Sequence, residues 1–297
     1  MIYTITTNPS LDYYMKFEKD LNFAEQNRSI EEKYDAGGKG VNVSIFLNYL
    51  GIQSGCLGFL GGFTKDYYLE KLLKYPSIQP LFTNIKENTR INIKTEANSS
   101  INLNAKGPSI KADEFEKFFA RTNRIYDTDY VVLSGNIQEE LVDKIIRLVA
   151  TLSTSGVKVI LDTDDIIVNS SLEFSPWAIK LNDRNSGTDE NTIIAKAKSF
   201  IEKGTSYVLY SSLVSDTFYL ISKDGAIKTS RMENTTAMMG SGDAMIAGFI
   251  YSSLRGADQN ESFKYATACS CLLHLIDNNI SRKEIEDSVK KIEIIKL

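Results

Sequence analysis

The most reactive pattern in the sequence is a carboxylate flanked by glycines near residue 240. Gly240, Ser241 and Gly242 directly precede Asp243, and an apolar stretch follows over residues 244–254. Two glycines ahead of a predicted helix leave backbone N–H groups open to an anion, which the helix dipole also attracts. A carboxylate there suits removal of a proton from a hydroxyl that attacks a phosphoryl group. Taken alone, the tetrapeptide is better explained by Asp243 capping its own helix.

A second glycine-rich segment, Ala36–Ser44, surrounds Lys39 with three glycines and opens a helix predicted over Val41–Leu50. Lys39 supplies a point charge, and Asn42 places a hydrogen-bonding side chain one turn into the helix. The spacing fits neither a P-loop nor a dinucleotide fingerprint. A glycine-rich turn with a solvated lysine explains the segment equally well.

Two shorter motifs carry groups that could bind a sugar phosphate. Asp12 ends the run Asn8–Asp12 after the first predicted strand, where a carboxylate can accept hydrogen bonds from sugar hydroxyls. Arg90, within Asn88–Asn92, could bind a phosphate through two parallel hydrogen bonds. In isolation, turn chemistry explains the first motif better, and a solvent-facing strand residue explains the second better.

The elements that must position these groups alternate between strand and helix, which predicts a mostly parallel sheet covered on both faces. Lys223–Gly225 predicts a hairpin between two late strands. Two polar, β-forming segments interrupt the alternation, at about residues 13–33 and 82–104. We expect them to form a small sheet that acts as a lid over the carboxyl ends of the main strands, where ligands bind in open α/β sheets. The whole chain, residues 1–297, is then expected to be one domain with this insertion.

Composition restricts the function classes. The chain has 297 residues and a formal net charge of −4, so it has no global attraction for nucleic acid or for an anionic membrane. It has only three cysteines, an odd number, and their spacing does not match a metal-binding pattern. This favours reduced thiols in a cytoplasmic protein. The N-terminus reads as a strand and not as a signal peptide. His274 is the one histidine, which argues against a His/Cys metal site.

In this order, the motifs resemble those of the ribokinase-like sugar kinases, in particular the phosphofructokinase B type with its 1-phosphofructokinases and tagatose-6-phosphate kinases. The resemblance spans nearly the whole chain and is specific because several weak motifs recur at the expected spacing. The matching segments are Ile2–Asp12, Asn27-Arg28, Ala36–Ser44, Leu57–Gly62, Thr89–Asn92, Leu133–Gly135 and Gly240–Gly248.

The resemblance implies a doubly wound α/β fold with a β-sheet lid through which a homodimer could form. It also implies that Asp243 deprotonates a sugar hydroxyl and that the N–H groups of Gly240, Ser241 and Gly242 bind the transferring phosphoryl group. ATP and Mg²⁺ would be required. The implied substrate contacts are sugar-binding Asp12, Gly38 and Asn42, phosphate-binding Lys39 and Arg90, and an additional contact from Ser134.

Departures from the family pattern cluster on the nucleotide side. The usual Lys-Pro-Asn-x-x-Glu reads Lys180–Asn185 here, which keeps Lys180 and Asn182 as nucleotide contacts but replaces the metal-linked acid by Asn185. The glycine-rich loop after the next strand begins at Ser211, a further nucleotide contact, but has lost both glycines.

These observations leave two functions open. The first is ATP-dependent phosphorylation of fructose 1-phosphate, tagatose 6-phosphate or fructose 6-phosphate to a bisphosphate. The alternative is a catalytically weakened sugar-phosphate-binding or regulatory relative with an eroded ATP site. Lys39 and Arg90 argue against an unphosphorylated sugar or a nucleoside as substrate.

Overall fold

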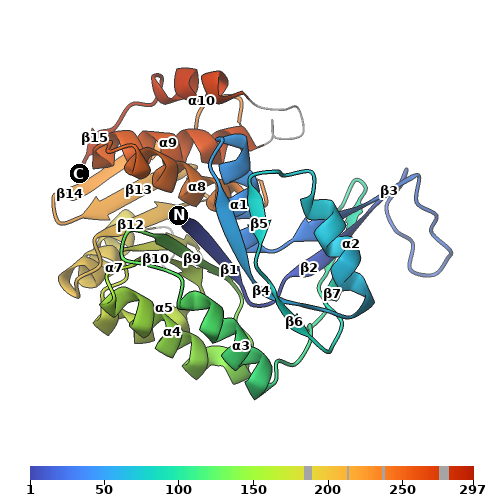
Figure 1. Ribbon diagram of the computed structural model, residues 1–297. Helices are drawn as coiled ribbons and strands as arrows, with labels where there is room; N and C mark the ends of the chain where they lie inside the picture. The colour runs from blue at the N-terminus through green and yellow to red at the C-terminus, as the bar shows by residue number, and fades with distance from the viewer. Residues whose placement is uncertain (184–188, 213, 236–237, 274–280) are drawn as a thin grey trace.

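The main sheet of the protein is eleven-stranded and mostly parallel (Figure 1). The structure is a computed structural model that describes residues 1–183, 189–212, 214–235, 238–273 and 281–297. The strand order is β15-β14-β13-β12-β11-β10-β9-β1-β4-β5, with β6 pairing β4. The strands are β1 (Ile2–Thr6), β4 (Ser54–Gly61), β5 (Ile78–Pro80), β6 (Thr83–Ile85), β9 (Tyr130–Gly135), β10 (Lys158–Thr163), β11 (Ala178–Asn182), β12 (Tyr207–Ser211), β13 (Thr217–Ser222), β14 (Gly225–Ser230) and β15 (Ile295–Lys296).

Pairing is parallel from β5 through β12 and antiparallel from β12 to β15. The predicted hairpin is confirmed, because β13 and β14 pair directly across the turn at Lys223-Asp224. The central strands are apolar on both faces, as a parallel sheet covered by helices requires.

Helices cover both faces of the main sheet, which confirms the predicted doubly wound α/β fold (Figure 1). One face packs against amphipathic helices, where residues such as Phe115 and Phe118 are spaced to point inward together. On the other face, α8 is buried along nearly its whole length. The first layer contains α3 (Ala112–Thr122), α4 (Val142–Thr154), α5 (Asp165–Ser171) and α7 (Glu190–Glu202), with the short 3₁₀ turns η1 (Glu139–Leu141) and η2 (Leu172–Phe174); the second contains α1 (Lys39–Tyr49), α8 (Ser241–Leu254), α9 (Gln259–Leu272) and α10 (Arg282–Val289).

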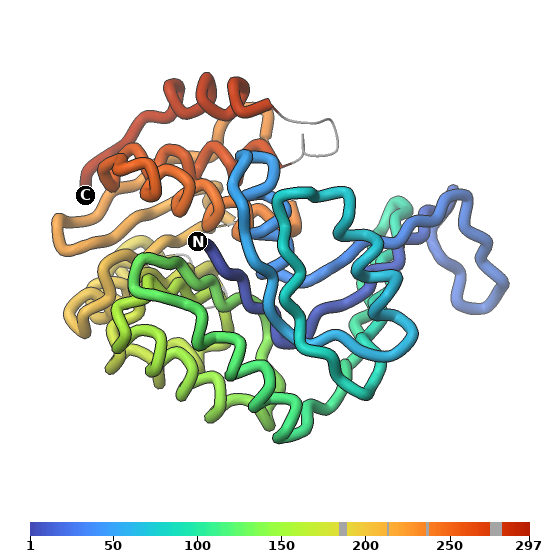
Figure 2. Tube along the Cα trace, in the orientation of Figure 1, coloured from blue at the N-terminus to red at the C-terminus, as the bar shows by residue number. Residues whose placement is uncertain are grey.

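A separate four-stranded sheet projects from one end of the molecule, in the order β3-β2-β7-β8 (Figures 1 and 2). Its strands are β2 (Ser10–Lys16), β3 (Glu31–Gly37), β7 (Arg90–Glu96) and β8 (Ile101–Leu103), and α2 (Gly62–Leu72) packs at its base. We call it the lid sheet. The expectation that two distant segments form a small sheet is confirmed, although β2 begins at Ser10 and β6, inside the second segment, joins the main sheet.

The lid sheet is closely tied to the main sheet, because only residues 7–9 separate β1 from β2. Strands β2 and β7 pair in parallel, so that Ser10, Asp12 and Tyr14 stand opposite Arg90, Asn92 and Lys94. These residues alternate along their strands and therefore share one face of the lid sheet. Within the described residues, no helix is long and apolar enough to cross a bilayer.

Candidate active site

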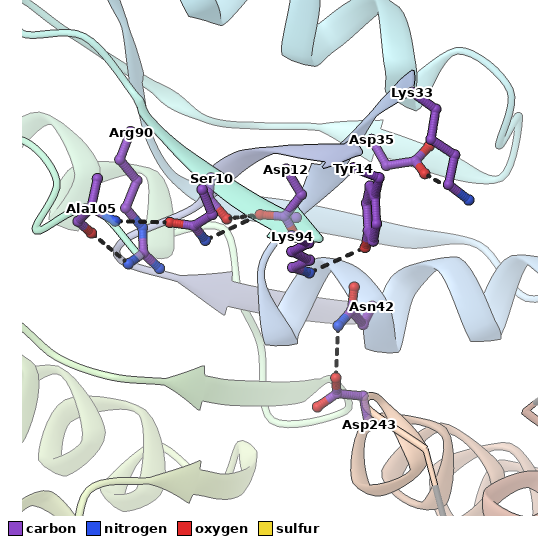
Figure 3. Close-up of polar contacts among 12 residues, drawn as sticks. Ser10, Asp12, Tyr14, Lys33, Asp35, Asn42, Arg90, Lys94, Ala105 and Asp243 are labelled. Atoms are coloured by element: carbon purple, nitrogen blue, oxygen red, sulfur yellow. Dashed lines mark hydrogen bonds and ion pairs between the residues drawn. The ribbon is translucent and has the colours of Figure 1, made fainter. Parts of the chain in front are cut away.

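Asp243 lies in the first turn of α8 and faces the start of α1. Its carboxylate accepts a hydrogen bond of 2.8 Å from the side-chain amide of Asn42, so the contact joins the two glycine-rich segments (Figure 3). Asp243 is only 4% exposed. Residues 201 positions apart in sequence are thus brought together at one buried point.

Burial raises the pKa of Asp243 to about 7, and repulsion from the Asp162 carboxylate acts in the same direction. The hydrogen bond from Asn42 and the charges of Lys39 and Lys180 oppose this rise. A carboxylate with a pKa near neutrality is a stronger base than an ordinary aspartate but is still ionised in a large fraction of molecules at pH 7. Such a pKa suits a general base.

A row of polar side chains crosses the carboxyl ends of three neighbouring strands beside Asp243. Ser134 on β9 stands next to Asp162 on β10, and Lys180 follows on β11. The Asp162 carboxylate pairs with Lys39 at 3.2 Å and with Lys180 at 3.8 Å. Burial works against the charge of Lys39, but Asp162 and then Asp243 outweigh it and raise the pKa of Lys39. The sequence analysis missed Asp162, although its place at the end of a buried strand was a usable signal.

The turn before α8 is built for close approach of a ligand. Gly240 has φ of 93°, in the left-handed region that favours glycine. The Ser241 amide donates to the carbonyl of Met238 at 3.0 Å, whereas the following N–H groups in the first turn of a helix have no intrahelical acceptor. A Cβ atom at Gly242 would lie 2.7 Å from the Lys180 ammonium, so Lys180 sits directly beneath this turn. The amides and the ammonium group together make one electropositive corner.

Asp12 is held firmly in the lid sheet. Its Oδ1 accepts hydrogen bonds from Ser10 at 2.7 Å and Asn92 at 3.1 Å, and its Oδ2 pairs with Lys94 at 2.5 Å (Figure 3). A Cβ atom at Gly37 would overlap this carboxylate, so only glycine fits there. The sequence analysis missed Lys94, which reads as an ordinary exposed strand lysine without the tertiary structure.

Lys39 and Arg90, the two cations predicted to bind phosphate, have different kinds of partner in the structure. Lys39 pairs with Asp162, whereas the two terminal nitrogens of Arg90 donate to the carbonyls of Asn8 at 2.9 Å and Ala105 at 3.0 Å. The Arg90 Nε is buried without a partner, and burial lowers the pKa of the guanidinium. Arg90 is therefore a rigidly held cation with a remaining donor.

A cavity of about 670 Å³ separates the lid sheet from the start of α8. Asp12, Tyr14 and Lys94 line it on the lid side, and Asn42 and Gly240 line it on the other. Gly38, also predicted to bind sugar, has φ of 138° and lies against Thr6 at the base of this region. Ser134 Oγ and Thr6 Oγ1 are both buried and have no hydrogen-bond partner. Neither residue lines the cavity, so each is a buried hydroxyl group that lacks a hydrogen-bond partner among the described residues.

The nucleotide-side residues are placed at the ends of β11 and β12, where Asn182 stands opposite Ser211. The loop that follows is ordered by the Ser212 hydroxyl, which accepts hydrogen bonds from the amides of Val214 and Ser215. Asp216, which lies in the left-handed region, pairs with Arg231 at 2.7 Å. Asn185 lies outside the described residues.

The side chains at these strand ends include a carboxylate suited to Mg²⁺. The described residues hold no group of three or more His, Cys, Asp or Glu side chains that could bind a metal ion. Mg²⁺ in phosphoryl-transfer sites is, however, usually held by one or two carboxylates together with substrate phosphates and water. Asp162 fits that role, because it is the carboxylate at the strand ends between Lys39 and Lys180.

The profile of the pfkB family carbohydrate kinases matches residues 6–275. The chain belongs to this family. It is 31% identical to a 1-phosphofructokinase of Borreliella burgdorferi, over 99% of this chain and 98% of that protein. It is 26% identical to a D-tagatose-1-phosphate kinase of Bacillus licheniformis, over the full length of both. Relatives of these two kinds place it in the 1-phosphofructokinase and tagatose kinase branch.

The fold agrees with this assignment. The crystal structure of phosphofructokinase-2 from Escherichia coli in complex with substrates and products matches with a TM-score of 0.89, covers 98% of each chain and is 18% identical. This pfkB-family chain is therefore a carbohydrate kinase with a ribokinase-like fold. Kinases of the family use ATP with a divalent metal ion.

Proposed function

We propose that this pfkB-family kinase transfers the γ-phosphoryl group of ATP to a free hydroxyl of a ketohexose phosphate and forms a bisphosphate. The candidate substrates are fructose 1-phosphate, fructose 6-phosphate and tagatose 6-phosphate. The observation that carries the proposal is the position of Asp243, which lies between the sugar-sized cavity and the electropositive corner formed by Lys180 and the turn at Gly240.

Asp243 would take the proton from the attacking hydroxyl, with Asn42 holding the carboxylate in place. The N–H groups of Gly240, Ser241 and Gly242 would bind the oxygens of the phosphoryl group in flight. For the Ser241 amide, this requires release of its hydrogen bond to Met238. Preorganised donors of this kind stabilise charge that develops in the transition state.

The sugar phosphate would lie between the lid sheet and α1. Asp12, Gly38 and Asn42 would hold the sugar, and Ser134 would add a contact through its orphaned hydroxyl. We assign the phosphate already on the substrate to Arg90, with Lys39 as a second cation once the substrate competes with Asp162 for it.

ATP would supply the phosphoryl group, and Mg²⁺ would offset the charge of its phosphates. We assign the nucleotide to Lys180, Asn182 and Ser211, and the metal ion to Asp162. A cytoplasmic location follows from the need for ATP and is consistent with three buried free thiols.

A second candidate is a sugar-phosphate-binding relative with weakened catalysis. The sequence of the nucleotide-side loop favours it, since Leu213 and Asp216 occupy the positions where the two glycines of the family pattern would let the backbone approach phosphates. Calorimetry distinguishes the two candidates: binding of a ketohexose phosphate without binding of Mg-ATP would support this relative, and tight Mg-ATP binding would remove its basis.

A coupled assay of ADP release tests the kinase directly, with each of the three sugar phosphates as substrate. We expect turnover with at least one of them and a loss of about 10³-fold or more in Asp243→Asn, because general-base catalysis contributes about 10²–10⁴-fold. The variant should still bind the sugar phosphate. Absence of turnover with all three would contradict the proposal.

We further propose that the lid sheet closes over the sugar and that its free edges β3 and β8 allow a homodimer, since exposed edges favour strand pairing. Light scattering on the purified protein would test the dimer.

A further inference from the structure

The ammonium group of Lys94 has one donor to spare. Of its three N–H groups, one is used by Asp12 and one by the hydroxyl of Tyr14 at 3.1 Å (Figure 3). No other hydrogen bond of Lys94 is found within the described residues. The side chain is 15% exposed and lines the same cavity as its two partners. The third N–H group is therefore available to a molecule in the cavity.

The Asp12 carboxylate has an unused hydrogen-bond acceptor position next to this donor. Its Oδ1 already accepts two hydrogen bonds, from Ser10 and Asn92, while its Oδ2 accepts one, from Lys94. A carboxylate oxygen can accept two hydrogen bonds, so one acceptor position is left on Oδ2. The spare acceptor and the spare donor belong to groups that touch each other.

The charges at this point favour hydroxyl groups over a phosphate. Asp12 and Lys94 form a pair with no net charge, so a phosphate close to Lys94 would be repelled by Asp12 at a similar distance. Arg90, by contrast, bonds only to neutral carbonyls through its terminal nitrogens in the described structure, and its positive charge is not cancelled by a direct ion pair. The phosphate belongs with Arg90, and neutral polar groups belong with Asp12 and Lys94.

We propose that Lys94 is a specificity-determining residue, which donates to one sugar hydroxyl while Asp12 accepts a hydrogen bond from its neighbour. This inference rests on the proposed class of substrate. An epimer in which one of the two hydroxyls points the other way can satisfy only one of the two groups. A site built to hydrogen-bond a hydroxyl rejects a ligand that leaves its buried polar groups unpaired.

The test is direct binding of epimers, measured by calorimetry without ATP: fructose 6-phosphate is compared with tagatose 6-phosphate and fructose 1-phosphate with tagatose 1-phosphate, and the pair that binds more tightly is used. We expect the wild type to prefer one epimer by about tenfold or more, and Lys94→Met to reduce the preference to about threefold or less. The loss should come from weaker binding of the preferred epimer. Because ATP is absent, a protein that binds but does not phosphorylate would count against the kinase and not against Lys94.

The matched control is Lys33→Met, since Lys33 also lines the cavity and faces the Tyr14 ring but is 54% exposed. It should keep the preference of the wild type. Lys94→Arg retains a charged partner for Asp12 and should keep part of the preference between the epimers. This variant replaces Lys94→Met in the test if Lys94→Met does not fold. Equal affinity of the wild type for the two epimers, or an unchanged preference in both Lys94 variants, would overturn the inference.

Discussion

The proposed sugar side and the proposed nucleotide side of the site are built in different ways. On the sugar side, Asp12, Arg90 and Lys94 stand on paired strands, and each is fixed by contacts within the lid sheet or to the chain beside it. On the nucleotide side, Lys180, Asn182 and Ser211 also stand on paired strands, but the loop beyond them lacks the glycines of the family pattern.

The difference has a physical reason in how each group is held. Groups carried by strands keep their place because sheet pairing and core packing hold them. Groups supplied by a loop backbone depend on residues that allow close approach, and a few substitutions remove that possibility. Here the Ser212 hydroxyl accepts hydrogen bonds from two amides within the loop, and Asp216 pairs with Arg231, which directly follows β14.

The largest effect that separates the two sides is expected from Arg90→Ala. Removing a charged hydrogen-bond donor to phosphate costs about 1.5–3 kcal/mol, so the KM for the sugar phosphate should rise about 10–100-fold. The KM for ATP should change by less than about twofold. Steady-state kinetics with each substrate varied in turn measures both values.

Arg90 also ties down two backbone carbonyls, so the thermal stability of the variant must be measured alongside its kinetics. Unchanged turnover of a phosphorylated substrate by Arg90→Ala would contradict the assignment and would favour an unphosphorylated sugar or a nucleoside instead.

Asp162→Asn should affect mainly the KM for Mg-ATP and not the KM for the sugar phosphate, with a slightly smaller change than Arg90→Ala causes. Losing the carboxylate removes a ligand for Mg²⁺ and the partner of two lysines, so the KM for Mg-ATP should rise about 10-fold or more, a typical cost of disturbing a metal site. The affinity for sugar phosphate should stay the same or rise, because Lys39 is no longer held by the Asp162 charge. If the sugar-phosphate affinity fell as much as the ATP affinity, the two sides would not be separable at this residue.

The smallest effect is expected from pH. Because burial raises the pKa of Asp243 to about 7, the base is mostly protonated at pH 6 and mostly ionised at pH 8. The value of kcat/KM, which reports the free enzyme, should therefore fall about tenfold per pH unit below the pKa and level off above it. The residual activity of Asp243→Asn should lack this inflection. A flat profile between pH 6 and 8 in the wild type would argue against Asp243 as the base.

Much of the main sheet could be predicted from the sequence, because buried strands and amphipathic helices carry their own periodicity. The run Asn8–Asp12 was read as turn chemistry in isolation, yet Ser10 and Asp12 begin β2. Pairing with β7, some 80 residues away, outweighs the local turn preference. Register between distant strands is a tertiary property that local patterns do not encode.

The site shows the same division. Asp243, Asn42 and Asp12 could be found because they stand in glycine-rich or motif-like surroundings. Asp162 and Lys94 lack such surroundings, and their importance comes from neighbours on other elements: Lys39 on α1 and Lys180 on β11 for the first, Asp12 and Tyr14 on β2 for the second. For Asp162, the signal in the sequence is its place at the end of a buried strand. A lone strand lysine or aspartate looks solvent-facing until those neighbours are known.

The register of β2 against β7 constrains how this site can evolve. The two strands form three cross-strand pairs on this face: Ser10 with Arg90, Asp12 with Asn92, and Tyr14 with Lys94. Insertion or deletion of one residue at the start of β7 would turn the side chains beyond it to the opposite face of the lid sheet. If this face binds the sugar as proposed, its preference can change through single side-chain substitutions, whereas a change of length in β7 would disrupt the whole face in one step and leave the core of the main sheet intact.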